Sequence, residues 1–569
     1  MRNLLYLCCC SFFFMTSLTA QTASADSTVL AKVMEEYGAW NPYPRGQHWR
    51  TTKGRSIKTE AEDLRALRSR VPAADKLSGT QRINRDLLLH VIDDQIYQRE
   101  FGAHRFPLDA EGGFLTSVVY RILGQRVNSD EGFTFYKEMV EGLGAYFADQ
   151  ISVMREGLKA GKTDPRLVVN NCLGQIERQL ATPVEESIFL QPVRDHEART
   201  QVLKKVVEQE TYAHYRELRD FLKNEYLPSL RQGIGISEIT DGKAYYEQRI
   251  RYFTTDDVTP EEVFSTGQKE VSRIRAEMEA IIKRTGFEGS FAEFLTFLRT
   301  DEQFYPKTPE DLLRHAAWIT KRMEGKLPQY FNKLPRMPLT VAPVPSALAP
   351  TYTTGRYSPG SYRRRKAGAF WVNTYDLPSR PLYVLPALAL HEGVPGHHTQ
   401  MMLAAEMKGL PAFRNNLYLS AFGEGWALYC EYLGKEAGIY ETEYEEFGAL
   451  VYEMWRACRL VVDPGMHYFG WSRDKAVDFL ASNTALSLHE VNTEIDRYIG
   501  WPGQAVSYKM GELKIRELRK MAETELGDKF DLPAFHDLVL ANGAVTMRGL
   551  EALVEEWILA VGQELETRN

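Results

Sequence analysis

The sequence predicts a large, mostly α-helical protein that carries one small β-sheet. From about residue 28 to 330, apolar residues recur at three- and four-residue spacings among charged residues, which is the period of amphipathic helices. The segment from Ala367 to Tyr375 is rich in aromatic and β-branched residues, the composition of a strand. The helical period returns at Pro386 and continues in blocks to the C-terminus.

The composition is that of a globular protein. A chain of 569 residues, 44% hydrophobic and 25% charged, can bury a large core. The net charge is only −7, and the longest basic tract is the four residues 363–366. The sequence therefore lacks the electrostatic signature of a nucleic-acid-binding protein.

The first 25 residues have the pattern of a signal peptide. Arg2 precedes an apolar run from Leu4 to Met15, and Ala23-Ser24-Ala25 offers a small-residue cleavage site. An uncleaved anchor is the alternative, although the run is shorter than the roughly 20 residues that a spanning helix needs. We expect a periplasmic or secreted protein with no stable membrane insertion after the signal is removed.

Three cysteines follow the predicted cleavage site, namely Cys172, Cys430 and Cys458. An odd number cannot form a closed disulfide framework in an oxidising compartment. We expect buried free thiols, with a single Cys430 to Cys458 bridge as the alternative.

The mature chain divides into two regions at a proline-rich segment. Five prolines lie between Pro335 and Pro350, which forbids a continuous helix. Residues 26–333 form the predicted N-terminal helical region, and residues 334–569 the predicted catalytic region. We expect both to form one continuous domain around a cleft. Residues 353–362 read as a loop, and residues 367–375 as the strand.

The sequence HEGVPGHHTQ, residues 391–400, is the strongest functional signal. A helix that starts near Pro386 carries His391 toward its end, and Pro395 then stops it because the proline ring clashes with the preceding turn. The glycines at 393 and 396 permit a bulge, after which a helix resumes at His397. In zinc proteases with the H-E-x-x-H motif, the second histidine lies four residues after the first. The bulge predicts that His397 takes this place.

A metal site follows from this arrangement. We expect His391 and His397 to be ligands of one Zn²⁺ ion, with His398 as the alternative ligand or as a residue behind them. A catalytic zinc site needs a third protein ligand, and Glu424, 27 residues after His397, is the best candidate. Glu431 lies seven residues later on nearly the same helical face. Other divalent ions also suit such a ligand set.

Glu392, beside a ligand, is expected to act as the general base. The alternative is that Glu392 is a solvated carboxylate on the helix surface with no catalytic role. For the whole cluster, the alternative is a set of hydrogen-bonded core histidines.

Four ordered blocks of the sequence resemble a known bacterial family, domain of unknown function 885. They are LPALALHEGVPGHHTQ, SAFGEGWALYCEYL, RACRLVVDPGMHYFGW and EIDRYIGWPGQAVSYKMGELKIRELR. This family is placed among the zincin metallopeptidases, and more distantly the chain is similar to angiotensin-converting enzyme and the thermostable carboxypeptidases. The resemblance implies a large helical zincin-like metallopeptidase fold with a small sheet beside the zinc helix. The H-E-x-x-P-G-H-H pattern of the family departs from H-E-x-x-H, and this sequence shares that departure.

The resemblance also implies where a substrate binds. An edge strand beside the zinc helix would pair with an extended peptide, and residues 367–375, which include Asn373, are in the right place. The alternative is an ordinary sheet strand. His467 and Tyr508 are candidates for stabilising the oxyanion, with Arg497 and Tyr498 behind them.

Gln504 and Lys509 are candidates for holding the C-terminal carboxylate of a substrate. Arg456 and Arg459, on one helix with Glu453, are expected to form an internal ion-pair network rather than a substrate clamp.

We therefore expect a zinc-dependent peptidase that hydrolyses small peptides with metal-activated water. A zinc hydrolase of another amide or ester and a catalytically silent periplasmic peptide-binding protein are the alternatives. The expected partner is a peptide or small amide substrate, and no nucleic acid. The residues do not fix an oligomeric state.

Overall fold

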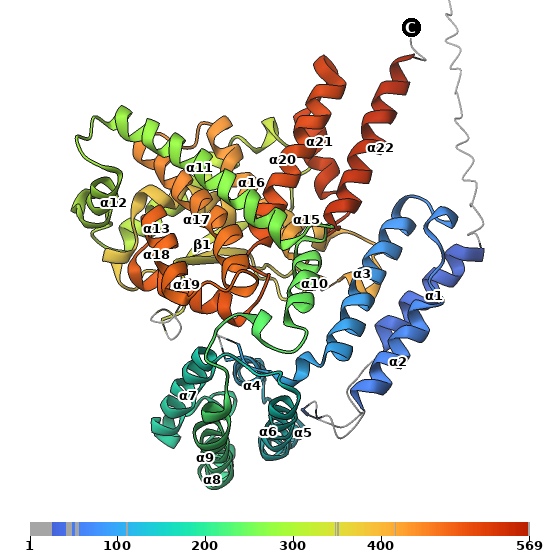
Figure 1. Ribbon diagram of the computed structural model, residues 1–569, viewed down its shortest axis with the longest axis vertical. Helices are drawn as coiled ribbons and strands as arrows, with labels where there is room; N and C mark the ends of the chain where they lie inside the picture. Colours follow the sequence, from blue (N-terminus) through green and yellow to red (C-terminus); the bar gives the residue numbers. More distant parts are fainter. Residues whose placement is uncertain are drawn as a thin grey trace, which may run out of the picture.

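The computed structural model describes residues 25–40, 48–49, 51, 56–109, 112–346, 349, 352–415 and 417–566. Nearly all of the predicted signal peptide, residues 1–24, lies outside this part of the chain. The described residues form a mostly α-helical structure with a small β-sheet, as predicted (Figure 1).

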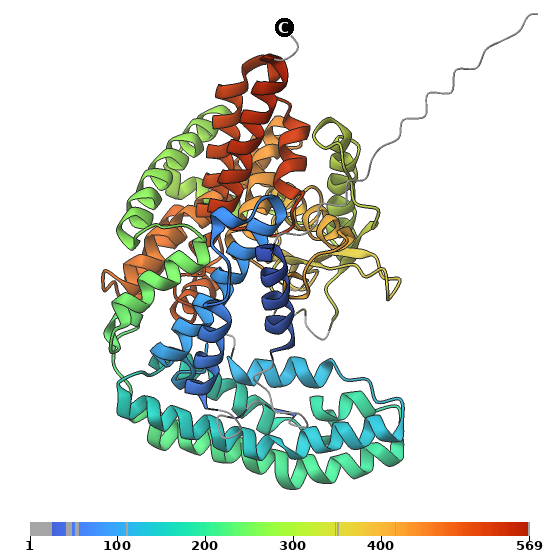
Figure 2. The same cartoon turned by 90° about the vertical axis from the view of Figure 1, so that its right-hand side faces the viewer.

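The first half of the chain is helical, as its period predicts. The helices are α1 (Ala25–Ala39), α2 (Ile57–Arg68), α3 (Gly79–Phe101), α4 (Phe114–Leu123), α5 (Asp130–Glu141), α6 (Leu143–Ala160), α7 (Arg166–Ala181), α8 (Glu197–Val206), α9 (Tyr212–Phe221), α10 (Gly242–Thr254), α11 (Pro260–Thr285), α12 (Phe291–Thr300) and α13 (Pro309–Glu324). Figure 2 shows α4 to α9 as a layer at one end of the molecule. Helix α11 begins at a capping box, in which Thr259 and Glu262 each accept a main-chain N–H of the other residue.

The sheet has three strands, β1 (Leu339–Pro343), β2 (Gly355–Ser358) and β3 (Gly368–Val372). β3 lies in the centre, parallel to β1 and antiparallel to β2. Two predictions are wrong here. The segment expected at the edge is the central strand, and the expected loop at 353–362 contains β2. Local composition reveals that a segment is extended but not which neighbours it pairs with.

The second half continues with α14 (Leu385–Glu392), α15 (His397–Glu406), α16 (Ser420–Glu436), α17 (Glu443–His467), α18 (Arg473–Asn483), α19 (Leu488–Gly500), α20 (Ser507–Leu526), α21 (Leu532–Leu540) and α22 (Met547–Glu566). Helix α17 is buried along most of its length and packs on α11, while α16 packs on α20. The largest apolar core contains residues from both sides of the proline-rich segment. The first and second halves therefore share a core.

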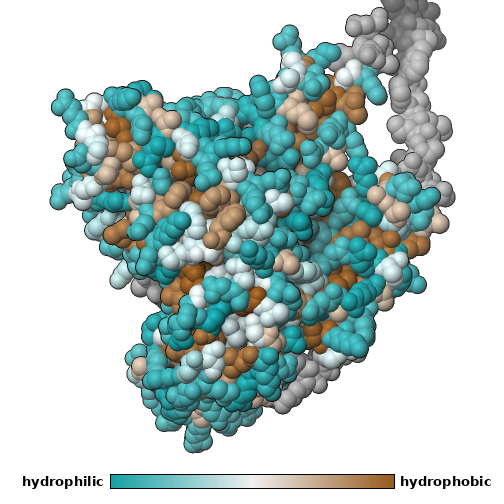
Figure 3. Space-filling view, viewed as in Figure 1, coloured by the Kyte–Doolittle hydropathy of each residue, from teal (hydrophilic) through white to brown (hydrophobic). Residues whose placement is uncertain are grey.

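The three cysteines are buried free thiols, as predicted, with Cys430 on α16 and Cys458 on α17. Burial raises the pKa of each thiol. Within the described part of the chain, no helix combines the length and the apolar character needed to span a bilayer. The face seen in Figure 3 is mostly hydrophilic, with apolar residues in small scattered groups.

Candidate metal centre

The predicted interruption between the two histidine-bearing helices is present. Helix α14 ends at Glu392, a turn spans residues 393–396, and α15 begins at His397. The N–H of Gly396 donates to the carbonyl of Leu390 at 3.0 Å. A Cβ atom on Gly396 would lie 2.0 Å from the carbonyl oxygen of His391. The tight return of the chain therefore requires a glycine at this position.

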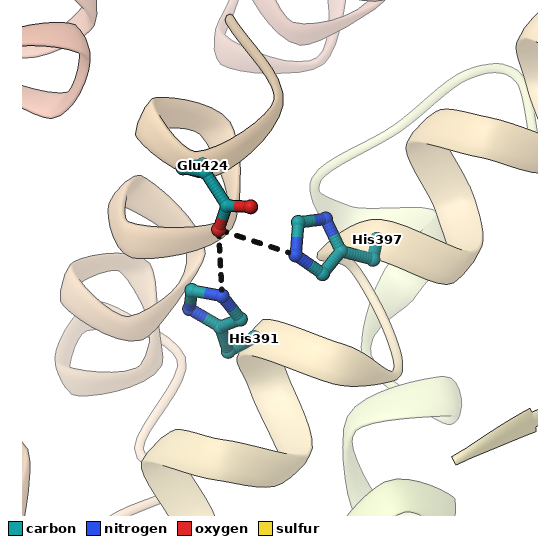
Figure 4. A group of neighbouring side chains, drawn as sticks. All are labelled: His391, His397 and Glu424. Atoms are coloured by element: carbon teal, nitrogen blue, oxygen red, sulfur yellow. Dashed lines mark ion pairs between the residues drawn. The ribbon is translucent and has the colours of Figure 1, made fainter. Parts of the chain in front are cut away.

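The turn brings His391 and His397 together opposite Glu424, which extends from α16 (Figure 4). The Nε2 atoms of His391 and His397 lie 3.4 Å and 3.5 Å from Oε2 of Glu424. All three potential ligand atoms lie within 4.8 Å of one another. Both histidines are buried and Glu424 is only partly exposed. The structure thus brings together the three residues predicted to bind the metal.

The donor set fits a zinc ion. Zinc binds histidine nitrogen and carboxylate oxygen at about 2.0–2.2 Å, and tetrahedral ligands at that range stand about 3.3 Å apart. The two nitrogen-to-oxygen separations are close to this value. They are long for charge-assisted hydrogen bonds, which are about 2.7–2.9 Å. Two imidazoles and one carboxylate also leave a fourth position for water or substrate.

Glu431 holds the ring of His391 from behind. Its Oε1 lies 2.7 Å from Nδ1 of His391, and both side chains are buried. A proton on Nδ1 leaves Nε2 as the nitrogen that faces Glu424. Burial opposes the charged imidazolium, but Glu424 and Glu431 outweigh it and raise the pKa of His391 to about 9. Burial likewise opposes the charge on Glu424, but the two imidazoles hold its pKa well below the ordinary value. The carboxylates of Glu424 and Glu431 therefore favour a positive charge at this site.

Glu392 contacts the sheet. The main-chain N–H of Tyr357, on β2, donates to Oε2 of Glu392 at 2.7 Å. The carboxylate is mostly buried. The predicted base thus lies in sequence next to the predicted ligand His391, and its carboxylate is held by the strand β2.

His398 is not an alternative ligand, because both of its ring nitrogens are engaged elsewhere. Nε2 lies 2.9 Å from the carbonyl oxygen of Met337, and Nδ1 lies 3.0 Å from Oη of Tyr357. Burial lowers the pKa of His398. Of its two predicted roles, only a place behind the ligands agrees with the structure.

Two tyrosines accompany Glu424. Tyr418 donates its phenolic hydrogen to Oε1 of Glu424 at 2.5 Å, and 46% of this tyrosine is exposed. Burial and the negative charge of Glu424 raise the pKa of Tyr508. Tyr508 therefore remains a candidate for stabilising the oxyanion. The sequence did not predict roles for Tyr418 and Tyr357, nor the contact of Glu431 with His391. The i+7 spacing from Glu424 to Glu431 was the only signal in the sequence for any of them.

His467 cannot stabilise an oxyanion in this fold. The N–H of Ile236 donates to its Nδ1 at 3.1 Å, so Nε2 carries the hydrogen and donates to the carbonyl of Tyr498 at 2.9 Å. Asn373 is also fully used. Its Nδ2 donates to main-chain carbonyls that include that of Ala349, and its Oδ1 accepts the N–H of Tyr375. The predicted roles of His467 in stabilising the oxyanion and of Asn373 in binding substrate are wrong, because the polar atoms of both side chains form hydrogen bonds within the protein.

Lys509 does not bind a substrate carboxylate, because it is fully buried against three carboxylates of its own chain. Its Nζ lies 2.6 Å from Glu453, 2.7 Å from Glu512 and 3.1 Å from Glu270. Burial alone would lower the pKa of Lys509, but these neighbours raise it.

Arg456 and Arg459 form internal ion pairs, as expected, but with carboxylates of other helices, while Glu453 pairs with Lys509. The guanidinium group of Arg459 pairs with Glu494 at 3.0 Å, and that of Arg456 lies 3.7 Å from Glu431. Arg456 thereby reaches the carboxylate that holds His391.

The remaining candidates tie helices together. Arg497 donates to Oε1 of Gln504 at 2.8 Å, and Nε2 of Gln504 lies 3.3 Å from Oγ of Ser420. The hydroxyl of Tyr498 accepts from Nε of Arg459 at 2.8 Å. None of these side chains is free to bind substrate. Because Ser420 begins α16, the contact from Gln504 supports the helix that carries Glu424.

Comparison with known proteins places this fold in context. The family described as "Bacterial protein of unknown function (DUF885)" matches residues 43–554. A protein of Colwellia psychrerythraea predicted to be a lipoprotein is 24% identical, with a TM-score of 0.82 over 94% of this chain and 98% of that chain. A predicted lipoprotein of unknown function from Shewanella oneidensis is 17% identical, with a TM-score of 0.71 over 94% of this chain and 100% of that chain. These likenesses show a shared fold. No curated protein matches the chain.

Proposed function

The chain belongs to the bacterial family DUF885, whose function is unknown, and we propose that it is a zinc-dependent peptidase with a zincin-like fold. The observation that carries this proposal is the convergence of His391, His397 and Glu424, with Glu392 beside the first ligand. A zinc ion held by these three side chains supplies Lewis acidity, which makes a carbonyl more electrophilic and water more nucleophilic.

Glu392 acts as the general base in this proposal. Its carboxylate takes a proton from the attacking water as the new C–O bond forms. It then gives this proton to the amine as the C–N bond breaks, so that an acid and an amine leave. Burial against β2 limits the movement of the carboxylate, which favours a single orientation for both proton transfers.

Tyr508 is the remaining candidate for stabilising the oxyanion, because the charge of Glu424 acts on its phenol. Tyr418 instead donates its phenolic hydrogen to Oε1 of Glu424, so this hydrogen holds the predicted ligand and is not available to an oxyanion. A phenolic hydrogen aimed at the developing charge stabilises the transition state more than the ground state.

We place the substrate along β2. Among the residues that the structure describes, this strand pairs with another strand only on its β3 side, whereas β3 is paired on both sides. An extended peptide pairs with a strand through main-chain hydrogen bonds, and Tyr357 of β2 contacts the base. The proposed partner is therefore a small peptide.

We propose a periplasmic or secreted location. The signal-like pattern of residues 1–25 supports it. The two proteins of similar fold are themselves predicted lipoproteins, a description that is consistent with the cell envelope.

The test compares the wild-type protein with Glu392→Gln, both loaded with zinc and incubated with a peptide library and with acyl-amide substrates. Cleavage is read by mass spectrometry, and zinc content by elemental analysis. We expect peptide cleavage by the wild type and a loss of turnover by two or more orders of magnitude in the variant, at equal zinc content. Cleavage of acyl amides alone would establish a different hydrolase. Peptide binding without any cleavage would establish a binding protein.

A further inference from the structure

The contact between Tyr357 and His398 joins the sheet to the helix that carries the second ligand. Nε2 of His398 lies 2.9 Å from the carbonyl oxygen of Met337. A carbonyl oxygen only accepts, so Nε2 carries the hydrogen. Nδ1 is then the acceptor for the phenol of Tyr357, at 3.0 Å. Both side chains are buried.

The same tyrosine contacts the base through its main chain. Its N–H donates to Oε2 of Glu392 at 2.7 Å, on the edge of β2 that faces away from β3. The side chain of Tyr357 is thus anchored by α15, and its main chain holds Glu392 at the end of α14.

Gly368 on β3 leaves the room that this contact needs. A Cβ atom at this position would lie 2.5 Å from Oη of Tyr357 and 2.6 Å from Nδ1 of His398. Such separations are far below van der Waals contact, so any larger residue would push the two side chains apart. The absence of a side chain at Gly368 of β3 therefore makes room for the hydrogen bond between Tyr357 and His398.

We propose that Tyr357 and His398 are positioning residues for Glu392, an inference that rests on the proposed peptidase function. The contact between Tyr357 and His398 fixes β2 so that the N–H of Tyr357 donates a hydrogen bond to Oε2 of Glu392. Among the described residues, no side chain or main-chain group donates a hydrogen bond to the other oxygen, Oε1. Oε1 is therefore the oxygen that exchanges protons with water and with the leaving amine.

This assignment separates turnover from metal binding. His398 contributes no ligand atom to the cluster of His391, His397 and Glu424. Weakening the contact misplaces the base without removing a ligand. A displacement of about 1 Å at a reacting group can lower the rate by about a hundredfold.

Two substitutions of His398 test the proposal, because asparagine places its amide near Nδ1 and glutamine places its amide near Nε2. We expect His398→Asn to retain the contact with Tyr357 and most of the wild-type kcat. We expect His398→Gln and Tyr357→Phe each to lower kcat by about tenfold to a hundredfold, with zinc content unchanged. The double variant should be no worse than either single variant, because all three lose one interaction.

His536→Gln is the matched control. His536 is also buried, with Nε2 2.7 Å from Oη of Tyr429 and Nδ1 2.9 Å from the carbonyl of Tyr330. This variant should lose stability but keep the kcat of the folded enzyme. Wild-type kcat in both His398→Gln and Tyr357→Phe overturns the inference and leaves the proposed peptidase intact.

Hydrogen exchange provides a readout that does not depend on activity. In the metal-free protein, the amide of Tyr357 should exchange slowly, and exchange should accelerate at least tenfold in His398→Gln but not in His536→Gln. Unchanged protection of this amide in His398→Gln overturns the inference even if the protein cleaves no peptide. Absence of turnover in the zinc-loaded wild type, with the exchange pattern as expected, contradicts the proposed function alone.

Discussion

Nδ1 of His391 lies 2.7 Å from Oε1 of Glu431, and both side chains are buried. This contact fixes the tautomer in which Nε2 faces Glu424. Carboxylates that orient a ligand histidine in this way typically contribute a factor of about 10–100 to metal affinity.

Glu431→Gln should therefore weaken zinc binding by about 10–100-fold. The amide keeps the size of the side chain but loses the charge that favours a proton on Nδ1. A competition titration against a chromophoric chelator measures the affinity. Glu436→Gln, on the partly exposed face of the same helix, is the control and should bind zinc as the wild type does. Equal affinity of Glu431→Gln and wild type would remove this role.

Gly396→Ala should disrupt the turn between the two ligand helices. The new Cβ atom would lie 2.0 Å from the carbonyl oxygen of His391, which is main chain and cannot rotate away. We expect a loss of at least about 3 kcal/mol in the free energy of unfolding, measured in urea, together with loss of zinc binding. Gly174→Ala, in the middle of α7 with only an ordinary contact at 3.5 Å, should instead be neutral or stabilise by up to about 1 kcal/mol. Wild-type stability of Gly396→Ala would show that the turn is not tightly constrained.

Lys509→Met should destabilise the fold, because it leaves three carboxylates in a buried cluster without their cation. Removing one partner of a buried ion-pair network costs about 3–5 kcal/mol. The exposed pair of Lys321 with Glu324 provides the contrast, and Lys321→Met should cost less than about 1 kcal/mol. Urea unfolding measures both values. A stable Lys509→Met protein with a raised KM for peptides would restore the substrate-binding role that the structure contradicts.

The burial of His467 should contribute a loss of stability to the metal-free protein as the pH is lowered from 6.5 toward 4. Burial lowers the pKa of His467 to about 4, against an ordinary value of 6.5. Between these values the unfolded chain binds a proton that the folded protein does not, so acid favours unfolding. Above pH 6.5 this contribution is fully present.

His467→Asn isolates the contribution of this residue. The variant should take up about one proton fewer on unfolding within this window, which appears as a shallower dependence of the free energy of unfolding on pH. An identical slope in the wild type and the variant would mean that His467 is protonated in the fold.

The convergence of His391, His397 and Glu424 could be predicted because the sequence features that indicate it lie close together in the chain. Pro395 ends a helix through contacts with residues close to it in the sequence. This local effect correctly predicts that His397, and not His398, lies beside His391. Glu424 could be predicted because it lies at the start of a helical run, 27 residues after His397, a spacing like that of glutamate-type zinc proteases. Lys509 could not be assigned in the same way, because its partners Glu453 and Glu270 are brought to it by packing between helices.

The sheet shows the same limit. The composition of residues 367–375 reveals a strand, but its central place depends on β1 and β2, which pair with it from either side. β2 itself is only four residues long and contains glycine and serine, which give little strand signal. The contact of Tyr357 with Glu392 was therefore not visible in the sequence.

The central claim is that His391, His397 and Glu424 share one cation. A crystal of the zinc-loaded protein, measured at the zinc absorption edge, tests this most directly. We predict one anomalous peak about 2.0–2.2 Å from Nε2 of each histidine and from a carboxylate oxygen of Glu424. No peak at this position in crystals soaked with saturating zinc, or a peak bound by other residues, would contradict the account.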